Sequence, residues 1–238
     1  MKNTQLQLPM RFEYYLESAD LWSEILTPFI KVEGVITELC PGWAPKILLA
    51  LNKTSFSGTY TAVDSSKKAL LILQEFYQQI SPEFSFTALS QNVLTNPAPK
   101  SNILILNHIL DDLILLENSK QDLEDIYSIT SLKNAWQLLA EDPQLEAKIH
   151  KINNLLIQQI KNSLLTNGTL FIYQYPSYQD KLHTINHSWD ITEKMLKQLI
   201  VELLKDKTMS QIPLSKNITT RYTVDTNQFY IFQKNAKR

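Results

Sequence analysis

The sequence predicts an α/β fold in which helices cover both faces of a mainly parallel β-sheet. Short β-branched or apolar segments alternate with amphipathic helical segments, as in sheets built from strand–helix–strand units. The apolar run at 102–107 is typical of a parallel strand that is buried on both faces. Two β-rich segments, 219–225 and 228–234, predict a C-terminal antiparallel hairpin across a short Thr-Asn turn. We expect a single domain over residues 1–238.

The first part of the chain supplies three helices and two strands. Apolar residues recur on one helical face over 10–30, and 32–39 is a short β-branched strand. The segment 45–53 follows a turn that contains Pro and Gly, and it has a helical pattern. A glycine opens the strand at 58–64, and serine at the start of 65–80 suits the cap of the helix expected there.

The second part has longer helical segments. A strand is expected at 84–89, before the buried strand at 102–107. The stretch 122–165 is mostly helical, with a break near a proline. A further strand follows at 168–175, and 189–207 has the pattern of an amphipathic helix.

The composition argues against several classes of protein. Lys and Arg number 23 against 24 Asp and Glu, so charge gives no reason to expect nucleic acid or an anionic membrane as a partner. The single cysteine, Cys40, rules out an internal disulfide. No apolar run approaches the roughly 18 residues of a membrane span, and the first residues lack a signal-peptide pattern. We expect a soluble cytoplasmic protein, and the sequence indicates no oligomeric state.

Acidic residues and a small-residue turn follow the first two predicted strands. Ligands of such sheets bind beyond the carboxyl ends of the strands. Glu38 ends the first strand shortly before Gly42, and Asp64 ends the second strand 22 residues after Gly42. A carboxylate at about that spacing binds ribose hydroxyls in dinucleotide-binding folds. Each carboxylate alone also suits a cap or a solvated loop, but their joint placement favours ligand binding.

Five segments form an ordered set of motifs. "ELCPGWA" has the form of (D/E)-x-G-x-G-x-G, with Glu38 and Gly42 matching and with Cys40 and Ala44 in place of two glycines. "YTAVD", "FSFTALSQN", "NILILNHILDDL" and "LLTNGTLFIY" follow in that order. Together they resemble the motifs of the S-adenosylmethionine-dependent methyltransferases, over roughly residues 32–234. The resemblance implies a Rossmann-like three-layer sandwich with seven strands, the seventh reversed.

The resemblance also implies S-adenosyl-L-methionine as the cofactor. Gly42 would let the backbone approach it, whereas Cys40 and Ala44 suit the turn only if their φ angles are ordinary. In the family, the acid at the position of Asp64 binds the ribose, and the loop after the third strand lies beside the adenine. The implied cofactor-binding residues are Glu38, Cys40, Gly42, Asp64, Ser65, Ser90, Gln91 and Asn107.

The candidate catalytic residues follow the fourth and fifth strands. In the family the fourth strand points toward the transferred methyl group, so the resemblance assigns Asn107 and His108 to the reacting centre and Tyr175 to its edge. A histidine there is suited to accept a proton from a hydroxyl or amine near neutral pH. The alternative is a polar cluster that starts a helix, because Asn and Asp are good caps and Asp111 suits the first turn.

Residues that choose the acceptor are expected outside the shared core. Residues 1–31 are interpreted as an N-terminal helical lid, and 119–150 as a helical substrate cap. The expected acceptor-binding residues are Tyr14, Tyr15, Asp111, Trp136 and Tyr178. Core packing is the alternative for the aromatic residues. The i, i+4 pair His183 and His187 precedes the expected helix start, so we predict no metal site.

Three functions remain compatible with the sequence. The first is methyl transfer from S-adenosylmethionine to an oxygen or nitrogen atom of a small molecule, with alignment and desolvation as the protein's main contribution. The second keeps the cofactor but releases methylthioadenosine, for example by intramolecular cyclisation. The third is a non-catalytic binding subunit, which the replaced glycines of the first motif favour.

Overall fold

The structure is a computed structural model that describes residues 12–118 and 129–236, with only the backbone described at 12–14, 129, 178 and 179. Its centre is a seven-stranded sheet with the order β3-β2-β1-β4-β5-β7-β6. The strands are β1 (Val35–Leu39), β2 (Thr59–Asp64), β3 (Ser85–Ser90), β4 (Ser101–Asn107), β5 (Leu164–Tyr173), β6 (Met209–Ile212) and β7 (Phe229–Lys234). The first five strands pair in parallel, and β7 is antiparallel to both β5 and β6.

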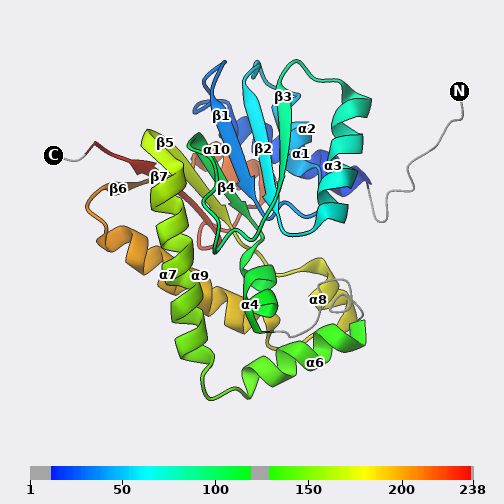
Figure 1. The fold of residues 1–238 in the computed structure, drawn as a ribbon, viewed down its shortest axis with the longest axis vertical. Coiled ribbons are helices and arrows are strands. Elements are labelled where there is room, and N and C mark those ends of the chain that lie inside the picture. The colour runs from blue at the N-terminus through cyan, green and yellow to red at the C-terminus, as the bar shows by residue number, and fades with distance from the viewer. Residues whose placement is uncertain (1–11, 119–128, 237–238) are drawn as a thin grey trace, which may run out of the picture.

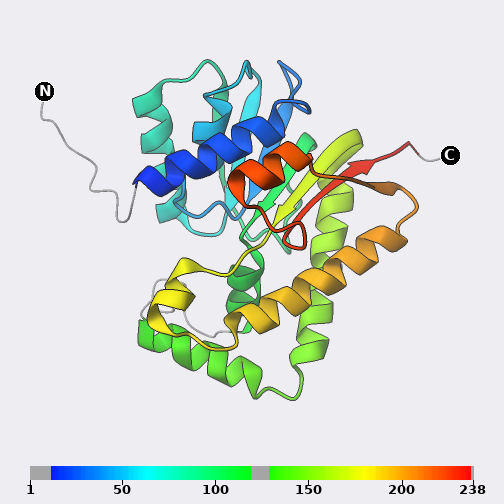
Figure 2. The same cartoon turned by 180° about the vertical axis from the view of Figure 1, so that it is seen from behind.

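Helices cover both faces of this sheet (Figures 1 and 2). One face carries α1 (Phe12–Leu26), α2 (Lys46–Leu51), α3 (Lys67–Ile80) and α10 (Lys216–Tyr222). The other carries α7 (Leu145–Ser163) and α9 (Ser188–Lys205). Helix α4 (Leu110–Asn118) packs against both of these, α6 (Ile129–Ala140) packs against α4, and the short α8 (Tyr178–His183) follows β5. The arrangement is the predicted three-layer sandwich with a mainly parallel sheet, so the predicted fold class is confirmed.

Alternation along the central strand divides the hydrophobic core in two. Ile103 and Ile105 of β4 pack toward α1 and α2, whereas Leu104 and Leu106 pack toward α4, α7 and α9. All four side chains are at most 1% exposed. Burial on both faces explains why this strand reads as a continuous apolar run.

The predicted C-terminal hairpin is wrong in its first strand. Residues 219–225 do not form a strand, because α10 covers Lys216–Tyr222 and a turn follows it. Ile218 and Tyr222, four residues apart, both pack on the core beside α1, which is the spacing of a helical face. The true partner of β7 is β6, an edge strand of four residues whose burial is too slight to leave an alternating pattern.

The N-terminal helix is a packing element in its described part. Trp22 of α1 is fully buried, and its ring lies 5.3 Å from that of Phe229 and 6.2 Å from that of Phe171. Helix α1 therefore packs on one face of the sheet (Figure 2), and the lid role of residues 1–31 stays a prediction. Residues 1–11 of that lid lie outside the described residues.

A second group of helices lies beyond the carboxyl ends of β4 and β5. Figure 1 shows α4, α6 and α8 gathered below these strand ends, with the N-terminal part of α9 beside them. Part of the predicted substrate cap, 119–150, belongs to this group, and 119–128 lie outside the described residues. In the described part of the chain, no helix is long and apolar enough to cross a membrane.

Candidate functional site

The loop after β1 is joined to the end of β2 by hydrogen bonds from two of its backbone amides. The Cys40 amide donates to the Val63 carbonyl at 2.7 Å, and the Gly42 amide donates to Oδ2 of Asp64 at 3.0 Å. Gly42 has φ +60°, and a Cβ placed there would meet no atom within 4 Å. The turn therefore needs glycine for its backbone conformation and leaves open space beside it.

Cys40 departs from the expectation for this loop. Its φ is +49°, in the left-handed region, whereas the sequence analysis required an ordinary value for a non-glycine residue. Ala44 meets that requirement, since its φ is not positive. Burial raises the pKa of the Cys40 thiol well above its usual value, and the nearby Asp64 raises it further. The thiol is thus a small packing group rather than a reactive one.

Asp64 holds its own turn together. Oδ1 accepts from the Ser66 amide at 2.8 Å while Oδ2 accepts from Gly42, and the side chain is only 6% exposed. Burial raises the pKa of Asp64, although the backbone N–H groups of Ser66, Gly42 and Ser65 oppose that rise. The Asp64 side chain therefore joins the loops after β1 and β2, whereas the cap of α3 is Ser66, whose hydroxyl accepts from the Ala69 amide. A carboxylate has about four lone-pair sites, so a ribose hydroxyl would share it with these amides.

Glu38 is a buried carboxyl group at the end of β1. It is 1% exposed, and Oε2 accepts from the Tyr60 hydroxyl at 2.5 Å. Burial raises the pKa of Glu38 to about 7, against the lowering effects of Tyr60, Lys46 and Asn107. At neutral pH this carboxyl is consequently protonated in a large fraction of molecules.

Lys46 was missed by the sequence analysis. It is the first residue of α2 and only 9% exposed, and its Nζ donates to the Tyr175 hydroxyl at 2.7 Å. The ammonium also lies 5.4 Å from the centre of the Tyr175 ring. The signal was a lone lysine directly before the apolar run "ILLAL", on a helix that buries every residue.

His108 lies at the start of the β4–α4 loop in a left-handed conformation, with φ +58°. Its amide donates to the Tyr173 carbonyl at 2.7 Å, and its ring lies 4.4 Å from that of Tyr175. Nδ1 pairs with Oδ1 of Asp111 at 3.1 Å. Gln174 Nε2 also donates to Asp111 Oδ1, at 3.2 Å, so this carboxylate is fixed from two sides.

The His108–Asp111 pair favours its charged form. Burial lowers the pKa of His108, but the charge and hydrogen bond of Asp111 raise it more, so the net shift is upward. For Asp111, burial raises the pKa and the interaction with His108 outweighs it, so the net shift is downward. Asp112 also raises the pKa of His108, and the carboxyl of Asp180 on α8 is close enough to interact with both members of the pair.

Asn107 carries an unfulfilled hydrogen-bonding atom. The residue ends β4 and is 7% exposed, and its side chain hydrogen-bonds to Glu38. Its Oδ1 is buried and has no hydrogen-bond partner within the described part of the protein. Buried acceptors are normally satisfied, so this atom is suited to receive a donor from a bound ligand.

The other predicted site residues divide into three groups. Ser65 and Ser90 are exposed beside Asp64, and the Gln91 amide donates to the Asp64 carbonyl at 2.9 Å, so these lie together at the strand ends. Trp136 is 1% exposed within the core beside α4 and α7, which gives it a packing role and leaves its ring inaccessible to an acceptor. Tyr15 is partly buried on α1, and the side chains of Tyr14 and Tyr178 lie outside the described residues.

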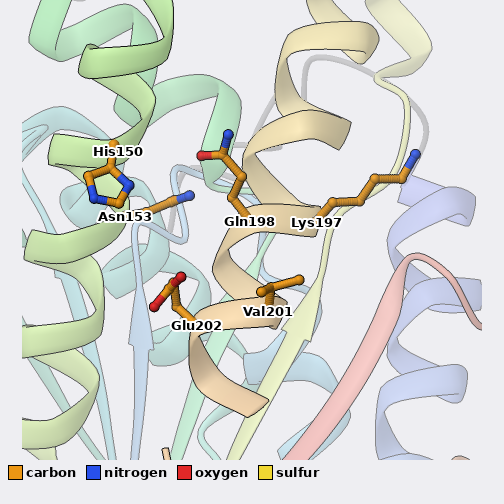
Figure 3. A pocket seen from close by; sticks show the side chains of 6 residues that line it. All are labelled: His150, Asn153, Lys197, Gln198, Val201 and Glu202. Carbon is orange, nitrogen blue, oxygen red and sulfur yellow. The ribbon is translucent and has the colours of Figure 1, made fainter. Parts of the chain in front are cut away.

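Two further features lie apart from this site. A groove of about 300 Å³ lies between α7 and α9, and its lining residues, drawn in Figure 3, include none of the strand-end residues. Across the described residues, no group of three or more His, Cys, Asp or Glu side chains is arranged to hold a metal ion.

Solved methyltransferase structures share this fold. A protein from Clostridium thermocellum described as an rRNA-methylase gives a TM-score of 0.52 at 10% identity, over 97% of this chain and 100% of that one. The plantazolicin methyltransferase BpumL, in complex with a pentazolic desmethylPZN analog and SAH, gives 0.55 at 12% identity, over 95% and 86%. An S-adenosyl-L-methionine-dependent methyltransferase from Methanococcus maripaludis gives 0.51 at 12%, over 95% and 88%.

These likenesses, at 10–12% identity, show the fold of the chain. It is the Rossmann-like, seven-stranded fold of the class I S-adenosylmethionine-dependent methyltransferases, as the ordered motifs predicted. No protein-family model and no curated protein matches the chain.

The buried Glu38 carboxyl predicts a pH-dependent stability. Its pKa is about 7 in the folded chain against 4.5 when unperturbed, so between these values the folded state holds a proton that the unfolded state releases. The free energy of unfolding should therefore fall by about 3 kcal/mol as the pH rises through this range.

Urea denaturation of the native chain and of Glu38→Gln at pH 5 and pH 8 measures this effect. The variant cannot ionise, so it should gain stability relative to the native chain as the pH rises. Glu75→Gln on the exposed face of α3 is the matched control and should show no relative gain. Equal pH dependence of the native chain and Glu38→Gln would show that Glu38 is ionised throughout.

Proposed function

We propose that the chain is an S-adenosylmethionine-dependent methyltransferase that acts on an oxygen or nitrogen atom of a small molecule. The observation that carries this proposal is the buried Oδ1 of Asn107 at the carboxyl end of β4, which finds no hydrogen-bond partner among residues 12–118 and 129–236. It lies beside the Glu38 carboxyl and directly before His108. In an open α/β sheet this is where ligands bind.

The residues at the strand ends fit the proposed cofactor. Glu38 and Asn107 offer acceptor oxygens for its ammonium group, and the open side of Gly42 allows close approach to the backbone. Asp64 with the neighbouring Ser90 and Gln91 would take the ribose and adenine end. When bound, the cofactor supplies a methyl group already activated by a sulfonium, so the protein needs chiefly to align and desolvate the acceptor.

His108 is proposed as the proton acceptor. With Nδ1–H donated to Asp111, the neutral imidazole has its free lone pair on Nε2, which can take a proton from an acceptor hydroxyl or amine. Gln174 fixes Asp111 and accepts from the Leu110 amide at 3.1 Å, which ties this pair to the start of α4. Tyr175 packs against the His108 ring and limits where an acceptor can lie.

The charges around His108 favour a small acceptor over a nucleic acid. Asp111, Asp112 and Asp180 outnumber Lys46 among the charged groups that interact electrostatically with this histidine. The whole chain has a net charge of -1. Phosphate backbones are bound by clusters of Lys and Arg, and an acidic surrounding repels them. Helices of the region 119–150 are proposed to complete the acceptor pocket.

A non-catalytic binding subunit is the second candidate. The left-handed Cys40 in the first loop and the three backbone amides on Asp64 favour it, because both leave less of the loop and the carboxylate for a ligand. Cofactor binding separates the two candidates.

S-adenosylhomocysteine should raise the melting temperature of the native chain, because a ligand that binds only the folded state stabilises it by mass action. At a concentration 100 times Kd the gain is about 2.7 kcal/mol. Differential scanning fluorimetry with adenosine as the control ligand measures it. The absence of any shift at about 1 mM, confirmed by calorimetry, would favour the non-catalytic subunit.

The proton-accepting role predicts an unusual titration of His108. Its imidazole should titrate above pH 6.5, and Asp111→Asn should lower that pKa because burial then acts without the opposing carboxylate. Asp112→Asn is the matched control and should lower it less. NMR titration of the histidine ring signals measures these values.

The rate of turnover should also depend on His108, which can be measured once an acceptor is identified. His108→Ala should lower kcat by about 10²–10⁴-fold and abolish the acid limb of the pH profile. The proton-accepting role would be contradicted if the pKa of His108 were the same in the native chain and in Asp111→Asn. It would also be contradicted if His108→Ala left the pH profile of turnover unchanged.

A further inference from the structure

Lys46 connects the two strands that flank β4. It begins α2, just after the β1 loop, while its hydrogen-bond partner Tyr175 follows β5. Both β1 and β5 pair with β4, whose end carries Asn107 and His108. The ammonium group therefore belongs to the same strand-end cluster as the candidate catalytic residues.

A buried ammonium group needs negative charge or strong acceptors around it. Among the groups that interact with Lys46 are the hydroxyl and ring of Tyr175, the carboxyl of Glu38 and the imidazole of His108. His108 adds positive charge when it is protonated. The Glu38 carboxyl is half-protonated near pH 7 and already accepts from Tyr60.

The cluster thus offers a ligand both a hydrogen-bond donor and hydrogen-bond acceptors. Lys46 is a cation with three N–H donors, and Asn107 Oδ1 and Glu38 are acceptors. An α-amino acid end carries a carboxylate and an ammonium group on neighbouring atoms. The cluster is complementary to such a zwitterion, since the ammonium can donate to Asn107 and Glu38 while the carboxylate accepts from Lys46.

We propose that Lys46 binds the carboxylate of the cofactor's amino-acid end and so selects ligands that retain it. The inference rests on the proposed function, because it assumes that an adenosyl amino acid occupies the strand ends. It predicts that affinity depends on the carboxylate through this one side chain. The hydrogen bond from Lys46 to Tyr175 would hold the ammonium group in place for that contact.

The test compares two ligands by calorimetry. One is S-adenosylhomocysteine, and the other is its decarboxylated analogue, which keeps the adenosyl group, the sulfur and the amine. Lys46→Met should weaken binding of S-adenosylhomocysteine by about 10–100-fold, the range for a charge-assisted hydrogen bond. It should change binding of the decarboxylated analogue by less than about threefold.

Two further variants keep the comparison interpretable. Lys46→Gln retains an N–H donor for Tyr175 and should reproduce the selective loss if Lys46→Met fails to fold. Lys53→Met removes an exposed lysine that pairs with Asp20 just beyond α2, and it should leave the affinity for both ligands unchanged. Circular dichroism and the melting temperature without ligand report folding of each variant.

The outcomes separate the inference from the proposed function. If the native chain binds neither ligand, the proposed function fails. Suppose that the native chain binds S-adenosylhomocysteine, and that Lys46→Met weakens the binding of both ligands equally or changes the binding of neither. The carboxylate assignment is then overturned, while the cofactor assignment stands. Only the selective loss supports Lys46 as the carboxylate-binding residue.

Discussion

The buried carboxyl group of Glu38 is the interaction on which the candidate site depends. It ends a central strand with 1% exposure, and Tyr60, Asn107 and Lys46 all direct polar groups toward it. Burying a charge is costly, so burial raises the pKa of this carboxyl to about 7, and the donors around it oppose that rise. The residues of β2, β4 and α2 are thereby brought to one point above the sheet.

Backbone strain marks the same place. Cys40 and His108 each adopt positive φ directly after a strand, and such conformations cost of order 1–3 kcal/mol for a non-glycine residue. Each is held by a hydrogen bond to a neighbouring strand, from Cys40 to Val63 and from His108 to Tyr173. These two positive-φ residues turn the chain sharply at the strand ends, beside the Asp64 carboxylate and the His108–Asp111 pair.

The sequence predicted the sheet better than the site. Apolar runs such as 102–107 and the order of the strand-end motifs follow from burial and chain connectivity, so the fold was predictable. The strand β6 was not, because an edge strand of four residues with two exposed at its centre leaves no alternating pattern. Within the site, the sequence assigned Asn107, His108 and Asp111 from their positions at and just after the end of β4. Lys46 and Tyr60 were not predicted, because their hydrogen-bond partners are distant in sequence. Trp136 was expected to bind an acceptor but is a core residue. Such contacts depend on tertiary geometry that one sequence does not reveal.

The central claim is that an adenosyl ligand binds at the carboxyl ends of β1, β2 and β4. A crystal structure of the chain grown with S-adenosylhomocysteine tests it most directly. The account predicts the ligand beside Gly42, with a donor within hydrogen-bonding distance of Asn107 Oδ1, which has no partner among the described residues. A ligand bound only in the groove between α7 and α9, or strand ends left empty at a saturating concentration, would contradict it.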